Sequence, residues 1–341
     1  MTDIPSALKP FIAKVSEGET LNFEQASEAF EIIMSGGATA AQIAGFLVAL
    51  RMRGEKVSEI SAAVKVIRSK AEPIKAPADA MDIVGTGGDG SGTLNISTAT
   101  AIVTAACGIP VAKHGNRALS SKSGTADALS MLGLNLEAPF AQIERAIREA
   151  NLGFMMAPRH HSSFKYVGPV RMELGIRTMF NILGPLCNPA GVKRYLLGVY
   201  SAQWVRPMAE TLAQLGCEKA WVVHGADGLD ELSTTGENLV CEVEGSSIRE
   251  FSIGPEAAGL PAASLEALKG GDAKYNAQRI RALLDGEKDA YRDIVLFGSA
   301  AALVIAGKVK ELSEGVGMAS TAIDSGKASQ TLEKLVAICQ P

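Results

Sequence analysis

The sequence has no excess of positive charge and few aromatic residues. Its 33 lysines and arginines are outnumbered by 37 aspartates and glutamates, which gives a net charge of −4. That balance argues against a large nucleic-acid footprint, which needs a basic face, although it leaves room for a local basic patch. Aromatic residues make up only 5% of the chain, whereas 35 residues are glycine. Glycine in that number favours tight turns and close approach of the backbone to a ligand.

Cysteine pairs that would form disulfides or bind a metal are also lacking. The five cysteines are scattered, with no CxxC pair and no metal-ligand spacing, at positions 107, 187, 217, 241 and 339. Such a set is typical of reduced, buried thiols in the cytosol. The N-terminal residues carry an aspartate and prolines and no apolar core. We therefore expect no signal peptide and a cytoplasmic location.

No uncharged stretch has the composition of a membrane-spanning helix. Residues 90–112 carry no charge, but glycines, Pro110 and several hydroxyl residues interrupt them, which predicts a buried helix followed by a buried strand. Residues 294–307 suit a helix of the protein core. With 47% hydrophobic and 21% charged residues over 341 positions, the chain is expected to be globular, with about two domains.

Residues 1–70 are dominated by helical patterns, whereas apolar runs typical of strands appear after about residue 80. Asn22 and Thr39 each begin a capping-box sequence before apolar residues at helical spacing, and Ser58 is expected to cap a third helix. Two prolines mark residues 71–80 as a linker. The expected strands cover residues 81–84, 109–112, 153–156, 195–200 and 220–223, and a polar hairpin covers 239–244 and 247–253. Strands alternating with helices predict a mainly parallel sheet, followed here by C-terminal helices.

A glycine-rich loop follows the first expected strand. Residues 85–89 read GTGGD, and the spacing of Gly85, Gly87 and Gly90 matches a dinucleotide-binding fingerprint. However, Asp89 lies inside the loop, no acid follows about 20 positions later to hold a ribose, and no lysine follows as in a P-loop. A cation or a sugar hydroxyl between Asp89 and a phosphate would explain the acid. A tight turn followed by an ordinary helix cap is the alternative.

Three further segments carry charge. Residues 113–125 combine cations, hydroxyls and glycines, which favours anion binding, with a solvated basic loop as the alternative. Asp230 and Glu231 lie in a glycine-rich turn after another strand and suit Mg²⁺ held jointly with substrate phosphates, unless they are ordinary surface acids. Arg171 and Arg177 share a short helical pattern, where a guanidinium either clamps a carboxylate or forms a structural ion pair.

Together these segments resemble the anthranilate phosphoribosyltransferase family. The similar segments are LRMRGE at 50–55, GTGGD at 85–89, NIST at 95–98, KHGNRALSSKSG at 113–124, GPVRMELGIRTMFNILGPLCNP at 168–189 and HGADGLDE at 224–231. The resemblance covers most of the chain. It implies transfer of the phosphoribosyl group of phosphoribosyl pyrophosphate (PRPP) to the amine of anthranilate, with release of pyrophosphate, in tryptophan biosynthesis. It also implies Mg²⁺ as the cofactor.

The family fold implies a small helical domain joined to a larger α/β domain. The helical domain is expected at residues 1–73 and about 162–185, and the α/β domain at 79–161 and 186–341. The resemblance further implies a homodimer formed through the helical domain, with no nucleic-acid or membrane partner. We expect the apolar helix faces to pack partly on residues 165–185 and partly on a second subunit. Those faces carry Phe23, Phe30, Ile33, Phe46, Leu47 and Leu50.

The resemblance also implies site residues, motif by motif. PRPP is expected to contact Gly85, Gly88, Asp89, Thr93, Asn95, Ile96, Ser97, Thr98, Lys113, His114, Gly115, Asn116, Arg117, Ala118, Leu119, Ser120, Ser121 and Thr125. Anthranilate is expected to contact Gly85, Asn116, His161 and Arg171, and magnesium to bind Ser97, Asp230 and Glu231. The chain departs from the family pattern at Thr125, where serine is usual, at Phe164, where methionine is frequent, and at the less familiar pair Ser162 and Ser163.

Three other functions remain alternatives. Pyrimidine nucleoside phosphorylases share the fold, but they should carry a first loop like KHSTGGVGD in place of DIVGTGGDG. Nucleic-acid-binding relatives without the transferase activity should show basic surfaces and lack the magnesium or substrate motifs. A nicotinamide-dependent dehydrogenase conflicts with the acid inside the glycine loop. For the transferase, no strong general base is expected, because the aromatic amine is weakly basic and its lone pair needs only positioning behind C1.

Overall fold

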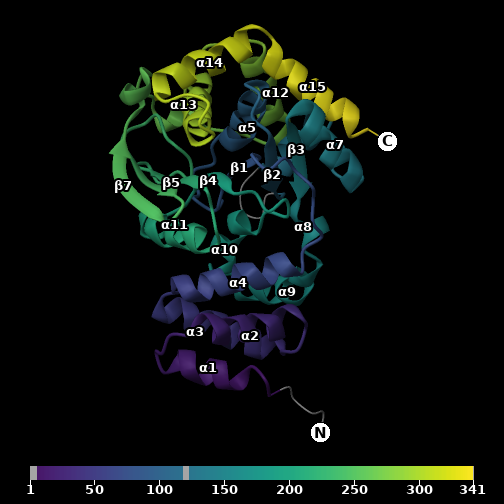
Figure 1. Cartoon of the computed structure of the whole chain (residues 1–341), viewed down its shortest axis with the longest axis vertical. Coiled ribbons are helices and arrows are strands. Elements are labelled where there is room, and N and C mark those ends of the chain that lie inside the picture. The colour runs from purple at the N-terminus through teal and green to yellow at the C-terminus, as the bar shows by residue number, and fades with distance from the viewer. Residues whose placement is uncertain (1–5, 118–122, 341) are drawn as a thin grey trace. The chain divides into compact units, whose positions relative to one another are not determined.

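The chain folds into two units, a small helical one and a larger α/β one. The computed structural model describes residues 6–117 and 123–340. One unit comprises Met1–Pro73 and Pro158–Pro189, and the other comprises Ile74–Ala157 and Ala190–Pro341. The larger unit contains a mainly parallel sheet and the C-terminal helices, so the expected fold class is confirmed (Figure 1). The domain boundaries expected near residues 73, 162 and 185 stay predictions.

The helical unit is built from N-terminal helices and a segment that returns later in the chain. The elements are α1 (Lys9–Ser16), α2 (Phe23–Met34), α3 (Ala40–Arg53), α4 (Val57–Ser69), α8 (Ala157–His160), η1 (Ser162–Tyr166), α9 (Gly168–Leu174), α10 (Phe180–Leu183) and η2 (Gly184–Cys187). Both predicted capping boxes are confirmed. At the first, Gln25 N donates to Asn22 Oδ1 at 2.9 Å, while Asn22 N donates to Gln25 Oε1 at 3.2 Å. The predicted cap at Ser58 is wrong, because α4 begins at Val57 and the Ser58 hydroxyl instead donates to Leu21 O at 3.0 Å.

Aromatic side chains form the core of the helical unit. Phe30 of α2 contacts Phe46 of α3 and Phe180 of the returning segment, with ring centroids 5.7 and 6.3 Å apart. The predicted packing of the N-terminal helices on the returning segment is confirmed by this contact, and the second-subunit contact stays a prediction, for which the side chains that are fully buried within this chain leave no surface. These are Phe30, Ile33, Phe46, Leu47 and Leu50. The N-terminal helices alone would leave part of their apolar surface exposed to water. The returning segment covers that surface, so these side chains are buried within one chain.

The larger unit contains one seven-stranded sheet with the strand order β3-β2-β1-β4-β5-β6-β7. The strands are β1 (Met81–Gly85), β2 (Val111–Gly115), β3 (Leu152–Met156), β4 (Arg194–Gly198), β5 (Lys219–Gly225), β6 (Asn238–Glu244) and β7 (Ser247–Ile253). The first five are parallel, and β6 and β7 form the predicted antiparallel hairpin. The second strand begins two residues later than predicted, because Pro110 has no N–H to donate and only its carbonyl, which accepts from Met81 N at 2.9 Å, bonds to β1.

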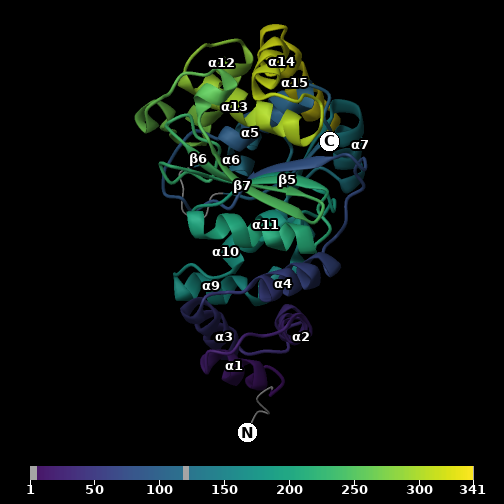
Figure 2. The ribbon, with the colours of Figure 1, turned by 60° about the vertical axis from the view of Figure 1, so that its left-hand side comes forward.

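Helices cover both faces of this sheet. They are α5 (Ile96–Ala106), α6 (Thr125–Met131), α7 (Phe140–Ala150), α11 (Val205–Gln214), α12 (Ala273–Leu284), α13 (Ala290–Ile305), α14 (Leu312–Asp324) and α15 (Lys327–Ile338), with short turns η3 (Ala202–Trp204), η4 (Pro255–Ala258) and η5 (Leu265–Leu268). Figure 2 shows α11 on one face of the sheet and α5 and α13 on the other. The uncharged residues 90–112 contain the buried helix α5 and the first two residues of β2, and residues 294–307 cover most of the buried helix α13. No helix within the described ranges is long and apolar enough to cross a membrane.

The strand order reverses at β1 and β4. From β1 the chain moves outward through β2 and β3, and it then returns to place β4 on the other side of β1. In open parallel sheets, ligands bind outside the carboxyl ends of the strands at such a reversal. Both strands end here in glycine, since Gly85 and Gly198 are paired in register.

Candidate functional site

An acidic turn closes against the glycine ends of β1 and β4. A Cβ atom built on Gly85 would lie 2.8 Å from Asp230 Cγ and 2.9 Å from Asp230 O. One built on Gly198 would overlap the carbonyl of Asp230 and lie 3.0 Å from Glu231 N. Because real Cβ atoms stay beyond these separations, only glycine at both strand ends lets the turn approach so closely.

The two carboxylates of this turn bind the backbone of the glycine loop and of the helix that follows it. Asp230 Oδ2 accepts a hydrogen bond from Gly87 N at 2.5 Å. Glu231 Oε1 accepts one from Ser97 N at 3.0 Å, in the first turn of α5. Asp89, inside the loop, lies close enough that its negative charge raises the pKa of the Asp230 carboxyl. Three carboxyl groups from two distant segments therefore meet beside the strand reversal.

Burial makes these carboxyl groups expensive to ionise. Desolvation raises the pKa of Asp230 well above its usual range, and the negative charges of Asp89 and Glu231 raise it further. Desolvation also raises the pKa of Glu231 to about 7, against the opposing effects of Lys113 and of the hydrogen bonds from Ser97. Clustered oxygen donors in need of positive charge fit a hard divalent cation such as Mg²⁺. The part of the chain that the structure describes forms no group of three or more His, Cys, Asp or Glu side chains placed to hold a metal ion by themselves.

A hydrogen-bond network that the sequence analysis missed holds the acidic turn in shape. Asp227 Oδ2 accepts from the hydroxyls of Ser233 and Thr235, both at 2.7 Å. Asn238, fully buried at the start of β6, donates to the carbonyl of Ser233 at 2.9 Å and to that of Ile253 at 3.0 Å. The only sign of this network in the sequence was the group of polar residues that follows the HGADGLDE segment, which includes Ser233, Thr235 and Asn238.

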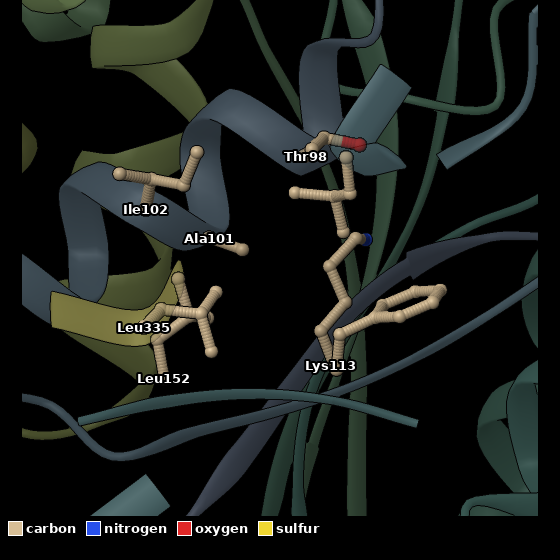
Figure 3. Close-up of a pocket in the computed structure, with 8 residues that line it drawn as sticks. Thr98, Ala101, Ile102, Lys113, Leu152 and Leu335 are labelled. Atoms are coloured by element: carbon tan, nitrogen blue, oxygen red, sulfur yellow. The ribbon is translucent and has the colours of Figure 1, made fainter. Parts of the chain in front are cut away.

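Lys113 brings a positive charge that acts on these carboxylates. Its ammonium donates to Ile83 O at 2.5 Å and interacts electrostatically with Asp82, Glu231 and Asp230. Figure 3 shows its aliphatic stem along a small apolar cavity beneath α5. The cavity is lined by Thr98, Ala101, Ile102, Leu129, Leu152, Phe154 and Leu335. Burial lowers the pKa of Lys113, although the surrounding carboxylates oppose that shift. The side chain therefore points into the protein as an internal counter-charge, and not onto the surface of the loop.

The glycine loop is held from its other side by a segment that the sequence analysis did not single out. Lys269 Nζ donates to Ser91 O at 2.7 Å, and Gly270 N donates to Gly92 O at 2.9 Å. Thr93 forms a β-bridge with Lys269. Gly88 has a positive φ of 76°, a conformation that glycine adopts readily. Loop amides are thus held in turns, which is the arrangement that cradles anions.

The second loop meets the first through hydroxyl groups. Thr98 Oγ1 donates to Thr125 Oγ1 at 3.3 Å, joining the start of α5 to the start of α6. Thr125 thus keeps the hydroxyl role expected of serine at that position. Asn116 is exposed, and Arg117 forms an ion pair with Asp127 at 3.0 Å.

Other residues expected in this loop are buried or lie outside the described ranges. His114 is buried at the end of β2, and its backbone N–H donates to Asp82 Oδ1 at 3.2 Å. Gly115 ends the strand, and a Cβ there would lie 2.8 Å from the Phe154 ring. Ile96 is buried within α5. Ala118, Leu119, Ser120 and Ser121 lie outside the residues that the structure describes.

The helical unit holds the remaining expected residues beside aromatic rings. The ring of His161 lies 5.7 Å from that of Phe164, and burial lowers the pKa of His161 to about 4. Arg171 of α9 places its guanidinium 5.5 Å from the centroid of the Phe180 ring, and burial lowers its pKa. No carboxylate of the described residues opposes that charge in an ion pair.

The structure therefore gathers most, but not all, of the expected site residues in one unit. The expected magnesium ligands and the described PRPP contacts all belong to the α/β unit, at the carboxyl edge of its sheet. The four residues expected around anthranilate are divided between the units. Gly85 and Asn116 belong to the α/β unit, and His161 and Arg171 belong to the helical unit.

Comparisons with known proteins agree with this site. A family model described as "Glycosyl transferase family, a/b domain" matches residues 77–329, and one described as "Glycosyl transferase family, helical bundle domain" matches residues 9–71. An anthranilate phosphoribosyltransferase of Parvibaculum lavamentivorans is 60% identical over 337 residues, covering 99% of this chain and 98% of its own. The crystal structure of an anthranilate phosphoribosyltransferase from Thermus thermophilus superimposes with a TM-score of 0.92 at 46% identity, over 97% of this chain and 99% of that one.

A second solved structure shows a relative with ligands bound. It is an anthranilate phosphoribosyltransferase from Saccharomyces cerevisiae in complex with PRPP and Mg. It has a TM-score of 0.89 and is 28% identical, with 97% of both chains covered.

Proposed function

Because the chain belongs to the anthranilate phosphoribosyltransferase family of glycosyl transferases, we propose that it transfers the phosphoribosyl group of PRPP to the amine of anthranilate. The products are N-(5-phosphoribosyl)anthranilate and pyrophosphate, and the reaction is a step of tryptophan biosynthesis. Both relatives whose structures were compared carry this enzyme's name, over nearly the whole chain. A pyrimidine phosphorylase, a nucleic-acid-binding relative and a dehydrogenase have no comparable support.

One observation carries the proposal from the structure itself. Asp230 and Glu231 are brought against the glycine loop at the point where the strand order reverses. Buried acids beside a loop of donor amides suit a ligand that combines a phosphate with a cation. PRPP with Mg²⁺ is such a ligand, and the yeast relative binds both.

Ser97, Asp230 and Glu231 would hold the magnesium in this chain, since their oxygens lie on the two segments that meet here. When bound, Mg²⁺ supplies positive charge to the phosphate oxygens that gain negative charge as pyrophosphate leaves. The loop amides and the N-terminus of α5 donate to the same oxygens. Asp89 would accept a hydrogen bond from a ribose hydroxyl of PRPP.

The transfer needs little general acid–base catalysis by the protein. The bond from ribose C1 to the pyrophosphate oxygen breaks, and pyrophosphate keeps the electron pair. The anthranilate nitrogen forms the new bond to C1 with its lone pair and then loses a proton to solvent or to the departing phosphate. The chain's contribution is to hold the amine in line behind C1 and to stabilise the leaving group.

The described contact residues have distinct parts in this proposal. Gly85, Gly88, Thr93, Asn95 and the first turn of α5 bind PRPP through loop amides and hydroxyls. Asn116 and Arg117 extend that surface on the second loop. Arg171 binds the anthranilate carboxylate, which would give its guanidinium the anionic partner that the described residues do not supply. Burial lowers the pKa of His161 to about 4, so its ring would meet anthranilate as a neutral group, and Gly85 and Asn116 are the anthranilate contacts proposed on the α/β unit.

A homodimer through the helical domain is also part of the proposal, at a surface other than the one expected from the sequence. The exposed fractions are 80% at Met52 on α3, 76% at Met172 on α9, and 43% at Ile176 just after it. The two helices contact each other, and the Arg51 guanidinium of α3 also donates to Arg177 O, beyond the end of α9. Large apolar side chains gathered at an exposed site are typical of an interface.

We further propose that the two units are separate domains and that the enzyme works in the cytoplasm. The five cysteines are all free, as is usual in a reducing compartment.

The proposal is tested by anthranilate fluorescence. Purified protein mixed with anthranilate, PRPP and Mg²⁺ should consume the fluorescent acceptor, and omission of PRPP or addition of excess EDTA should prevent the loss. Unchanged fluorescence in the complete mixture, from protein that melts cooperatively, would refute the proposed function. Thymidine with phosphate in place of the two substrates serves as the control for a phosphorylase.

A further inference from the structure

Buried polar groups from distant parts of the chain meet at Asn95, the residue just before α5. Asn276 of α12 is 1% exposed and lies outside every segment singled out in the sequence. Its Nδ2 donates to Asn95 Oδ1 at 2.9 Å. Its own Oδ1 accepts from Gly271 N at 2.8 Å. A buried carboxamide thus connects α12 with the end of the glycine loop.

These contacts fix the direction of both carboxamides. The backbone N–H of Gly271 can only donate, so Asn276 must present its oxygen to Gly271 and its nitrogen to Asn95. Asn95 must then present its own oxygen to Asn276. Ser123 Oγ donates to the same Asn95 oxygen at 3.2 Å. The Asn95 amide nitrogen is left as a donor, with only a long contact of 3.5 Å to Ser123 O.

The backbone of Asn95 is held as firmly as its side chain. The hydroxyl of Tyr291, fully buried on α13, donates to Asn95 O at 3.0 Å. One residue earlier, Leu94 N donates to Leu268 O at 2.9 Å. The peptide unit after Asn95 and the one before Leu94 are therefore both tied to the C-terminal part of the chain.

We propose that Asn276 is a positioning residue for PRPP binding, which orients the Asn95 carboxamide so that its N–H donors face the phosphates where the two loops meet. Asn276 acts through Asn95 and touches no substrate. The inference rests on the proposed function, since it takes PRPP as the ligand of these loops. It adds α12 to the elements that shape the site, because the orientation originates at the backbone of Gly271.

The test exploits the difference between an amide and an acid. Asn276→Asp keeps the acceptor for Gly271 but loses the donor to Asn95, and the new carboxylate favours the reversed Asn95 amide. The reversed amide turns its oxygen toward the phosphates. We expect calorimetric titration with PRPP and Mg²⁺ to show affinity weakened about tenfold, as for the loss of one charge-assisted hydrogen bond. The KM for anthranilate should change less than about twofold, within ordinary mutational scatter.

A double-mutant cycle separates positioning from a general structural role. In an Asn95→Ala background, Asn276→Asp should cause no further loss of PRPP affinity, because the group it acts through is gone. Gln278→Glu is the matched control, since it makes the same amide-to-acid change at an exposed position of the same helix. It should leave PRPP affinity unchanged. If the buried charge prevents folding, Asn276→Ala carries the same cycle without adding charge.

Two results would overturn the inference. One is PRPP affinity that Asn276→Asp and Asn276→Ala leave unchanged. The other is a loss of affinity that adds in full to that of Asn95→Ala. Failure of the proposed function is distinguishable, because it shows as wild-type protein that binds PRPP without consuming anthranilate.

Discussion

Replacing Gly198 by alanine should separate the acidic turn from the strands that support it. The added methyl would overlap the Asp230 carbonyl and lie 3.0 Å from Glu231 N. The neighbouring atoms are backbone and cannot rotate away, so the turn must retreat by about 1 Å or more. A misplacement of about 1 Å in a catalytic group costs on the order of a hundredfold in rate. We therefore expect kcat/KM to fall about a hundredfold, and saturation to require a higher Mg²⁺ concentration.

The assay is the loss of anthranilate fluorescence at several Mg²⁺ concentrations, with thermal unfolding measured in parallel. Gly317→Ala in α14 is the control, because a Cβ there meets nothing within 4 Å. That variant should keep full activity and gain slightly in stability, since alanine favours a helix by roughly 0.5–1 kcal/mol over glycine. A Gly198→Ala enzyme with wild-type activity and Mg²⁺ dependence would refute the reasoning that links the strand ends to the carboxylates.

Four further predictions follow from individual residues. Desolvation raises the pKa of Glu231 to about 7 in the metal-free protein, so the folded state holds this proton more tightly than the unfolded state, where the value is 4.5. The free energy of unfolding that this proton contributes is fully present below about pH 4.5 and is lost as the pH rises through 7. Glu231→Gln cannot ionise, so it should raise the free energy of unfolding of the metal-free protein at pH 8 by up to about 3 kcal/mol, and much less at pH 5. Denaturant titrations at the two pH values measure this difference. Arg171→Ala should raise the KM for anthranilate about ten- to a hundredfold and that for PRPP little, and equal effects on both would assign Arg171 a structural role. Met52→Glu with Met172→Glu should convert a particle of about twice 35.5 kDa in light scattering to a monomer, whereas an unaltered mass would move the interface elsewhere. Glu59→Gln should lower the unfolding free energy by about 3 kcal/mol in denaturant titrations, because Arg53 loses the partner of a buried ion pair, and a change near zero would contradict that cost.

The parts of the fold that depend on local signals were predictable from the sequence. The capping boxes at Asn22 and Thr39 and the apolar run at β1 are local, and each element formed where predicted. The cap at Ser58 was wrong, because its hydroxyl bonds to Leu21, far away in the chain. Packing of the N-terminal helices on the returning segment was also predictable, and the contact of Phe30 with Phe180 confirms it, but the sequence does not show which apolar side chains this contact buries completely.

The candidate site shows the same division. The motifs located the glycine loop and the acidic pair, but nothing in their spacing shows that Gly198 makes room for Asp230. Composition counted Lys113 among the cations of an anion-binding loop, yet the alternation of β2 turns its side chain inward toward the carboxylates. Asn276 gave no signal at all, because its importance arises only where α12 reaches Asn95 in the folded chain.

The most direct test of the account compares wild-type enzyme with an Asp230→Asn, Glu231→Gln double variant in one experiment. Anthranilate consumed and pyrophosphate released are measured together, at saturating PRPP and ordinary Mg²⁺. The account predicts that wild type produces one pyrophosphate for each anthranilate consumed, and that the folded double variant produces essentially none. Pyrophosphate released without anthranilate consumption by wild type, or undiminished turnover by the double variant, would contradict it.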